Sequence, residues 1–203
     1  YHGDDIKELA RLIYERDGDK YLTVPSAERC AAFVAFGLPY NIARMQRDLE
    51  RYRIHFDQWF LESSLHSSGY VAETVQLLTD AGLTYEKDGA LWLRNTDLGA
   101  DKDEVLRRSN GFYTYYAVDI AYHRNKFEVR GFDKVINIWG ADPHGHVARL
   151  KVAIDALGLD GTNRLDIVRM QLVKLVPILN AAGVAKHMGG VVGLVNTHGR
   201  GVH

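Results

Sequence analysis

The chain has 203 residues and a formal net charge of −1, and 46% of its residues are apolar and 25% charged. This composition excludes an intrinsically disordered chain, and the near-zero charge excludes binding of nucleic acid through overall charge, though not through a local basic patch. The single cysteine, Cys30, excludes an intramolecular disulfide and fits a reducing compartment. No apolar run reaches the roughly 18 residues of a membrane span. Because the sequence starts at Tyr1 and not at Met, we expect a piece of a longer protein.

The first 55 residues have the apolar spacing of helices. Apolar side chains from Ile6 to Tyr14 predict a first helix, which Asp17-Gly18-Asp19 is expected to end. Ser26 is the expected N-cap of a second helix. We expect Gly37-Leu38-Pro39 to break that helix before a further amphipathic run from Ile42 to Tyr52, because proline lacks the backbone N–H that continues a helix.

A predicted helix over Glu73 to Ala81 precedes a segment with two hairpin signals. Asp88-Gly89 separates two short alternating runs, and Asn110-Gly111 separates Val105–Ser109 from Phe112–Tyr115. Both dipeptides supply the left-handed residues of a tight hairpin turn. The sequence therefore predicts a small antiparallel element.

The pattern then becomes that of an α/β fold. We expect a helix over Asp119 to Lys126, a strand over Lys134 to Trp139, a helix from about His144 to Leu157 and a strand over Asp166 to Val173. Strand, helix and strand predict a parallel pair, and ligands of such sheets bind at the carboxyl ends of the strands. Gly140-Ala141-Asp142 lies at such an end.

The end of the chain has a different composition. From Pro177 to His203 there are six glycines and no acidic residue, and the apolar residues show no clear period. We expect irregular structure in this tail.

Tyr115 and Asp119 are four positions apart, where a strand is expected to give way to a helix. If the helix begins near Val118, Asp119 lies in its first turn and Tyr115 faces the same cavity from the strand end. A carboxylate beside a phenol suits a guanidinium or ammonium ligand. The alternative is a helix-capping aspartate beside a packed tyrosine.

The segment Asp142-Pro143-His144-Gly145-His146 carries three potential ligands within five residues. Asp142, His144 and His146 could hold a divalent metal such as zinc, as in a metal-dependent hydrolase. Alternatively, the two histidines meet an anion at a helix N-terminus, or they are solvated in a turn.

Two further groupings carry weaker signals. Glu62-Ser63-Ser64 could line a pocket wall, but a helix cap is favoured. Asp119 and His123 could form a catalytic pair, but a surface pair one helical turn apart is favoured.

Several strings in the sequence resemble the catalytic domain of the arginyl-tRNA synthetases, a family of class I aminoacyl-tRNA synthetases. They occur in family order and extend the resemblance over Tyr1 to Val176. The strings are Tyr1-His2-Gly3-Asp4, Phe56-Asp57-x-Trp59-Phe60, Glu62-Ser63-Ser64-Leu65, Asp88-Gly89-Ala90-Leu91-Trp92-Leu93, Asp101-Lys102-Asp103, Thr114-Tyr115, Asp119-Ile120-Ala121-Tyr122-His123 and Trp139-Gly140-Ala141-Asp142.

The resemblance implies an incomplete α/β catalytic domain of the Rossmann type with an inserted helical and hairpin subdomain. Residues 1–59 would form a helical part of the catalytic domain, 60–115 the insert, 116–176 the second half of the Rossmann-type domain, and 177–203 a glycine-rich tail outside the resemblance. The implied activity of the intact enzyme is the ATP-dependent, Mg²⁺-requiring activation of arginine and its transfer to an arginine tRNA in the cytoplasm, without a membrane partner.

The resemblance also assigns residues to the site. Tyr115 and Asp119 would hold the substrate arginine, and Asp142, His144 and Gly145 would line the arginine and adenylate pocket. The family uses no zinc there, so no metal ligands are expected, and no catalytic residue is assigned.

Both ATP signatures of class I synthetases are missing from the sequence: a His-x-Gly-His element and a Lys-Met-Ser-Lys-like loop. Thr197-His198-Gly199-Arg200-Gly201 resembles the segment after the first signature but lies at the wrong end of the chain. We therefore expect the chain alone to be inactive and to bind no ATP, or alternatively to be a synthetase-like arginine-binding or regulatory module. Pro143 and Phe112-Tyr113 depart from the family pattern and leave substrate choice open.

Overall fold

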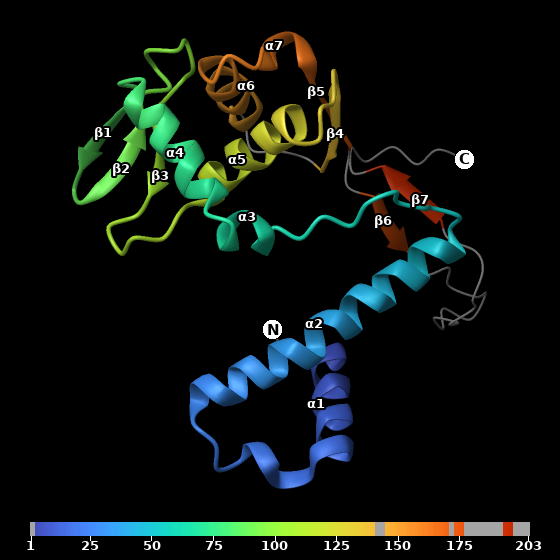
Figure 1. Cartoon of the computed structure of the whole chain (residues 1–203). Coiled ribbons are helices and arrows are strands. Elements are labelled where there is room, and N and C mark those ends of the chain that lie inside the picture. The colour runs from blue at the N-terminus through green and yellow to red at the C-terminus, as the bar shows by residue number, and fades with distance from the viewer. Residues whose placement is uncertain (1–2, 141–144, 171–172, 177–192, 197–203) are drawn as a thin grey trace. The chain divides into compact units, whose positions relative to one another are not determined.

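A computed structural model describes residues 3–140, 145–170, 173–176 and 193–196. The chain divides into two compact units, Tyr1–Phe60 and Leu61–His203 (Figure 1). The domain boundaries expected from the sequence remain predictions.

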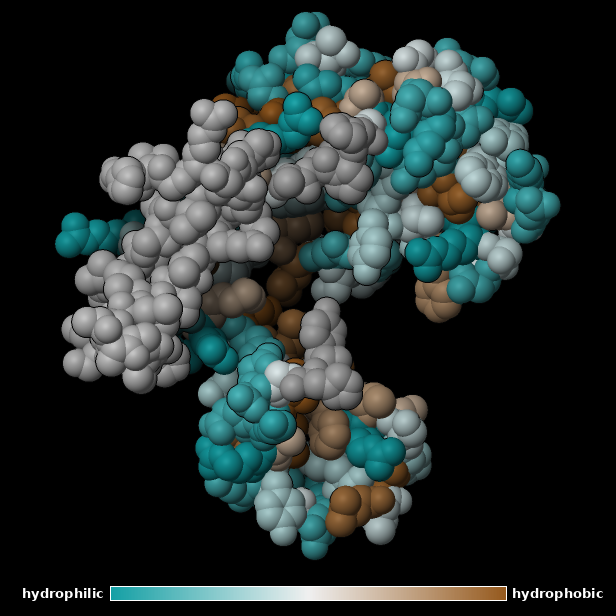
Figure 2. Space-filling model, turned by 180° about the vertical axis from the view of Figure 1, so that it is seen from behind, coloured by the Kyte–Doolittle hydropathy of each residue, from teal (hydrophilic) through white to brown (hydrophobic). Residues whose placement is uncertain are grey.

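The first unit is helical. It consists of α1 (Asp4–Asp17), a short 3₁₀ turn (Gly18–Tyr21) and α2 (Ser26–Arg51). Few of its side chains are buried, and apolar residues reach its surface (Figure 2). Pro25 occupies the N-cap position of α2 and Ser26 is the first helical residue, without a capping hydrogen bond from its side chain, so the predicted cap was wrong by one position.

The predicted break in α2 was also wrong, because Pro39 lies inside the helix. The proline is exposed, so its missing N–H leaves a backbone carbonyl facing water and not an apolar core. The neighbouring Gly37 is buried, and a Cβ there would lie 3.6 Å from Leu9 Cδ1 of α1. Gly37 thus marks the packing contact between the two helices and not a helix end.

The second unit begins with two helices and an antiparallel sheet. Its elements are α3 (Ser63–Ser67), α4 (Tyr70–Asp80), β1 (Thr84–Lys87), β2 (Ala90–Leu93) and β3 (Glu104–Arg107), and the strand order is β1-β2-β3. The Asp88-Gly89 hairpin is confirmed, with both residues in the left-handed region (φ 54° and 73°) and Lys87 paired with Ala90.

The second predicted hairpin forms only in part. Arg107 and Tyr113 make a single antiparallel bridge around the Asn110-Gly111 turn, and no strand follows it. Thr114 ends the extended segment because its hydroxyl accepts a hydrogen bond from the Ala117 N–H (3.4 Å) and so caps a helix.

That helix, α5 (Tyr115–Glu128), packs against α4, β3 and α6 (Figure 1). After it come β4 (Val135–Trp139), α6 (His146–Ala156), α7 (Gly161–Arg164) and β5 (Leu165–Arg169). The prediction of a parallel pair is confirmed, because β4 and β5 run parallel from Val135 opposite Leu165 to Trp139 opposite Arg169. The outer face of this pair leaves Ile136, Ile138 and Val168 exposed.

The fifth strand ends at Arg169, four residues earlier than expected. Val173–Val176 forms a separate strand, β6, which pairs antiparallel with β7 (Gly193–Asn196). The expectation of irregular structure in the tail was therefore wrong for 193–196, and the rest of the tail lies outside the described residues. None of the helices in the described part of the chain is long and apolar enough to cross a membrane.

Candidate functional site

The site starts on α5, whose first residue is Tyr115 and not a residue near Val118. Tyr115 is therefore helical and not at a strand end, and Asp119 lies in the second helical turn. Residues four apart share one face of a helix, so both side chains project from the same side of α5. Tyr115 is 80% exposed, which contradicts the alternative of a packed tyrosine.

The Asp119 carboxylate faces His146, the first residue of α6, with 3.1 Å between Oδ2 and the imidazole Nε2. The Asp119 side chain is 38% exposed and that of His146 is 22% exposed. The imidazole lies against the rings of Trp139 and Tyr116, at centroid distances of 5.5 and 5.9 Å. A carboxylate that is open on one side and buttressed on the other is suited to a cationic ligand.

His123 is buried and does not pair with the Asp119 carboxylate, so neither interpretation of that pair is correct. Its Nδ1 lies 2.7 Å from the Asp119 backbone carbonyl and its Nε2 lies 2.6 Å from the Asn137 amide nitrogen. Burial lowers the pKa of His123 to about 4. The neutral ring therefore donates through Nδ1–H and accepts at Nε2, which fixes the backbone of Asp119 against β4.

Lys126 completes this buried group by donating from Nζ to the Asn137 amide oxygen at 3.0 Å. Its ammonium also lies 4.2 Å from the centroid of the Tyr122 ring. Burial lowers the pKa of Lys126 to about 8. The Asn137 amide thus accepts from Lys126 through its oxygen and donates to the neutral His123 through its nitrogen. These two hydrogen bonds fix the orientation of the amide.

Arg149 anchors the start of α6 on β3 and the loop before it, a role that the sequence analysis missed. Its guanidinium donates from Nε to Glu104 (2.6 Å) and from Nη1 to Asp101 (2.9 Å). Burial opposes the charged form of Arg149, but the two carboxylate partners together outweigh it and raise the pKa of Arg149, and the hydrogen bond from Arg149 lowers the pKa of Asp101. The Asp101-Lys102-Asp103 string offered one half of this ion pair, but its partner, Arg149, lies 48 positions further along the sequence. The sequence alone therefore does not show the pairing.

Gly145, the residue before α6, has a left-handed backbone with φ 98°. A Cβ there would lie 2.5 Å from Arg149 Nη1 and 2.8 Å from Asp101 Oδ2. Glycine is therefore required for this ion pair to approach the helix start. This is a structural reason for Gly145, beside its predicted place in the pocket.

The remaining predicted residues form no site in the described part of the chain. Asp142 and His144 lie outside the described residues, and no three His, Cys, Asp or Glu side chains gather elsewhere in the described part to hold a metal ion. Glu62 precedes α3 without a capping hydrogen bond, so the favoured helix cap is not made there. The Ser64 hydroxyl instead donates to the Leu61 carbonyl at 2.6 Å.

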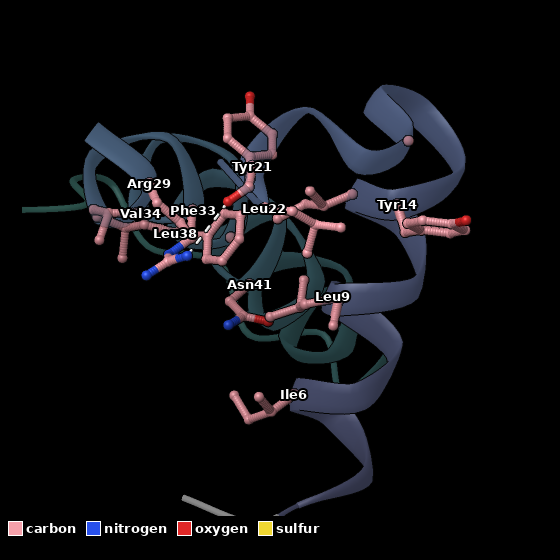
Figure 3. A pocket seen from close by; sticks show the side chains of 14 residues that line it. Ile6, Leu9, Tyr14, Tyr21, Leu22, Arg29, Phe33, Val34, Leu38 and Asn41 are labelled. Atoms are coloured by element: carbon pink, nitrogen blue, oxygen red, sulfur yellow. Dashed lines mark hydrogen bonds between the residues drawn. The ribbon is translucent and has the colours of Figure 1, made fainter. Parts of the chain in front are cut away.

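Each unit has a hollow of its own. One, of about 740 Å³, lies between α1 and α2 and is lined mainly by apolar side chains (Figure 3). Its charged residue is Arg29, which donates to the Tyr21 carbonyl at 3.4 Å, and no carboxylate lines it, so it does not suit a guanidinium ligand. The other, of about 590 Å³, adjoins Tyr115 and includes Trp92 and Arg108.

The model of one protein family, described as tRNA synthetases class I (R), catalytic domain, matches residues 38–194. The chain belongs to this family. The resemblance noted in the sequence is thereby confirmed, and the elements above are part of an α/β class I synthetase catalytic domain.

Two curated relatives show how much of a class I arginyl synthetase the chain represents. The arginine–tRNA ligase of Ruminiclostridium cellulolyticum is 55% identical over 196 residues, which is 97% of this chain and 35% of the relative. That of Caldanaerobacter subterraneus subsp. tengcongensis is 54% identical over 194 residues, or 96% of this chain and 34% of the relative. The chain thus spans about a third of the length of these relatives.

Two solved structures of arginyl-tRNA synthetases are similar to this chain. A putative arginyl-tRNA synthetase from Campylobacter jejuni is 33% identical with a TM-score of 0.77, covering 95% of this chain and 40% of that one. The Thermus thermophilus arginyl-tRNA synthetase, at 18% identity and a TM-score of 0.60 over 79% of this chain and 34% of that one, supports the fold alone.

Proposed function

We propose that this chain is the arginine-binding portion of the catalytic domain of an arginine–tRNA ligase. The observation that carries the proposal is the common face of α5 from which Tyr115 and Asp119 project. The carboxylate would accept two N–H groups of the guanidinium, and the exposed phenol would supply a hydrogen bond or a ring face. Asp142, His144 and Gly145 would line the adjoining arginine and adenylate pocket.

The reaction of the intact ligase would join this site to ATP and tRNA. Arginine, held by its side chain, would present its carboxylate to ATP with Mg²⁺, and the activated arginine would then pass to an arginine tRNA in the cytoplasm. The residues of this chain contribute the selection of the cationic side chain. They hold arginine and exclude a neutral analogue, because the negative charge of Asp119 would then have no cationic ligand to balance it.

The 203 residues alone are not expected to form the adenylate. Neither ATP signature occurs in the sequence. Groups of that kind stabilise charge that develops in the transition state, and removing one commonly costs about 10²–10³ in rate. We therefore propose that the chain binds arginine but does not charge tRNA by itself.

Calorimetric titration of the chain with L-arginine and with L-citrulline tests the proposal. Citrulline has nearly the same shape as arginine but a neutral urea group. We expect saturable binding of arginine and at least about tenfold weaker binding of citrulline, because a charge-assisted hydrogen bond is lost. Asp119→Asn should weaken arginine binding by a similar factor.

Asp97→Asn is the matched control, because Asp97 is an exposed aspartate that lies in the turn after β2 and not on α5. It should bind arginine as the unmodified chain does. Equal affinity for arginine and citrulline, or unchanged affinity in Asp119→Asn, would show that Asp119 does not recognise the guanidinium.

A further inference from the structure

His146 contacts the Asp119 carboxylate. Neither the sequence nor membership of the family assigns a role to this contact. The imidazole Nε2 of His146 lies 3.1 Å from Asp119 Oδ2, and this is the one hydrogen bond that the Asp119 carboxylate makes in the described part of the chain. The contact joins the start of α6 to the middle of α5, across 27 positions of sequence. We propose that His146 is a positioning residue that holds the Asp119 carboxylate in the orientation that receives the arginine side chain.

The imidazole is itself held in place. It stands at the first position of α6, behind the left-handed Gly145, and packs against the rings of Trp139 and Tyr116. The Tyr116 hydroxyl in turn donates to the Arg149 backbone carbonyl of α6 at 2.9 Å. A donor fixed by β4, α5 and α6 together can set the plane of the carboxylate that it binds.

This contact leaves the carboxylate available to a ligand. An ionised carboxylate has about four lone-pair positions, and His146 uses one of them on Oδ2. The guanidinium fork donates two parallel N–H groups and needs the carboxylate in a fixed plane. One N–H donor on Oδ2 fixes that plane and leaves Oδ1 and the second Oδ2 position for arginine.

The proton on the imidazole then affects binding. A protonated His146 would place a positive charge beside the arginine guanidinium, so arginine binding should weaken as the pH falls through the range in which an imidazole gains a proton. Three groups near the pair, His123, Lys126 and Tyr116, keep their charge between pH 7.0 and 5.5. Burial lowers the pKa of His123 to about 4 and that of Lys126 to about 8, and it raises that of Tyr116.

The inference rests on the proposed function, and two variants at one position test it. His146→Phe keeps a ring between Trp139 and Tyr116 but has no donor, whereas His146→Gln keeps an N–H donor that does not titrate. At pH 7.5 we expect arginine to bind about tenfold more weakly to His146→Phe and within about threefold of the unmodified chain to His146→Gln. His66→Phe, an exposed histidine on α3, is the control.

The pH profile separates positioning from packing. Between pH 7.0 and 5.5 the unmodified chain should lose at least about threefold in arginine affinity, and His146→Gln should lose less. Any titration of His144 remains in both proteins and can be subtracted. Circular dichroism establishes that each variant is folded.

The outcomes distinguish this inference from the proposed function. Normal arginine binding by His146→Phe, or equal pH profiles for the unmodified chain and His146→Gln, overturns the role of His146 and leaves the arginine site standing. Equal losses in the Phe and Gln variants at pH 7.5 also overturn it. Absence of arginine binding by the unmodified chain overturns both.

Discussion

Asp119 is fixed at both ends. Its backbone carbonyl accepts from His123, and its carboxylate faces His146. His123 is 2% exposed, so protonation of its ring would lower the free energy of unfolding of the second unit. The neutral His123 therefore couples the geometry of the candidate site to the stability of the fold.

This coupling predicts a loss of stability in acid. The folded pKa of His123 is about 4 against an ordinary value of 6.5, so between these values the unfolded chain binds a proton that the folded chain does not. Stability from this group is full above about pH 6.5 and falls as the pH is lowered toward 4. We expect the free energy of unfolding in urea to drop by about 2 kcal/mol between pH 7.5 and 5.0 on this account.

The His123→Gln variant isolates that contribution. It should be less stable than the unmodified chain at pH 7.5 but should lose about 2 kcal/mol less on acidification. His66→Gln, at an exposed site, should behave like the unmodified chain. Equal acid losses in His123→Gln and the unmodified chain would contradict a neutral buried His123.

The sequence predicts one half of the candidate site and not the other. Tyr115 and Asp119 are four positions apart, so a local helix pattern suffices to bring them to one face. His146 reaches Asp119 only after β4 and α6 have folded back onto α5, and Arg149 meets Asp101 in the same way. Such contacts depend on tertiary packing, which apolar periodicity does not encode.

At the scale of elements, the junction of α6 and α7 is a close contact within the second unit. Gly161, the first residue of α7, is buried, and a Cβ there would lie 2.7 Å from Ile154 Cβ and 2.9 Å from the Lys151 carbonyl. Neither atom belongs to the end of a flexible side chain. A side chain at position 161 would therefore have to separate the two helices.

Gly161→Ala is expected to lower the free energy of unfolding by about 1–3 kcal/mol, because the added methyl group overpacks this contact. Urea denaturation followed by circular dichroism measures the change. Gly140→Ala is the control, since no atom of the residues that the structure describes lies within 4 Å of a Cβ there. Equal midpoints for the two variants would mean that the helices move apart without cost.

The hairpins show what local signals decide. Asp88-Gly89 gives a complete hairpin because strand-forming residues flank the turn on both sides. Asn110-Gly111 gives the turn and a single antiparallel bridge, because Thr114 also carries a strong helix-capping signal three residues later. Pro39 shows the reverse case, in which a strong local breaker lies within a 26-residue helix.

At the scale of the molecule, the two units differ in how much they bury. In Tyr1–Phe60 the described buried residues are Ile13 and Gly37, whereas α5 alone in the second unit buries eight. Local opening costs least where few apolar contacts are lost. The first unit should therefore open far more often than the second.

Hydrogen exchange followed by mass spectrometry measures this difference. Amides in the middle of α1 and α2 should exchange at least about tenfold faster than those in the middle of α5, after correction for intrinsic rates. Peptides from α4, which packs on α5, serve as the reference for the second unit. Equal protection in α2 and α5 would contradict independent opening of the two units.

The parallel pairing of β4 with β5 also sets an order of events during synthesis. Val135 pairs with Leu165, so a ribosome that has just made the start of β4 must add about 30 further residues, at about 5–20 residues per second, before its partner strand exists. For about 2–6 s β4 has no strand to pair with, and its backbone N–H and C=O groups are open to any chaperone that binds extended segments. The helices α4 and α5, made earlier and adjacent in space, have that time in which to dock first.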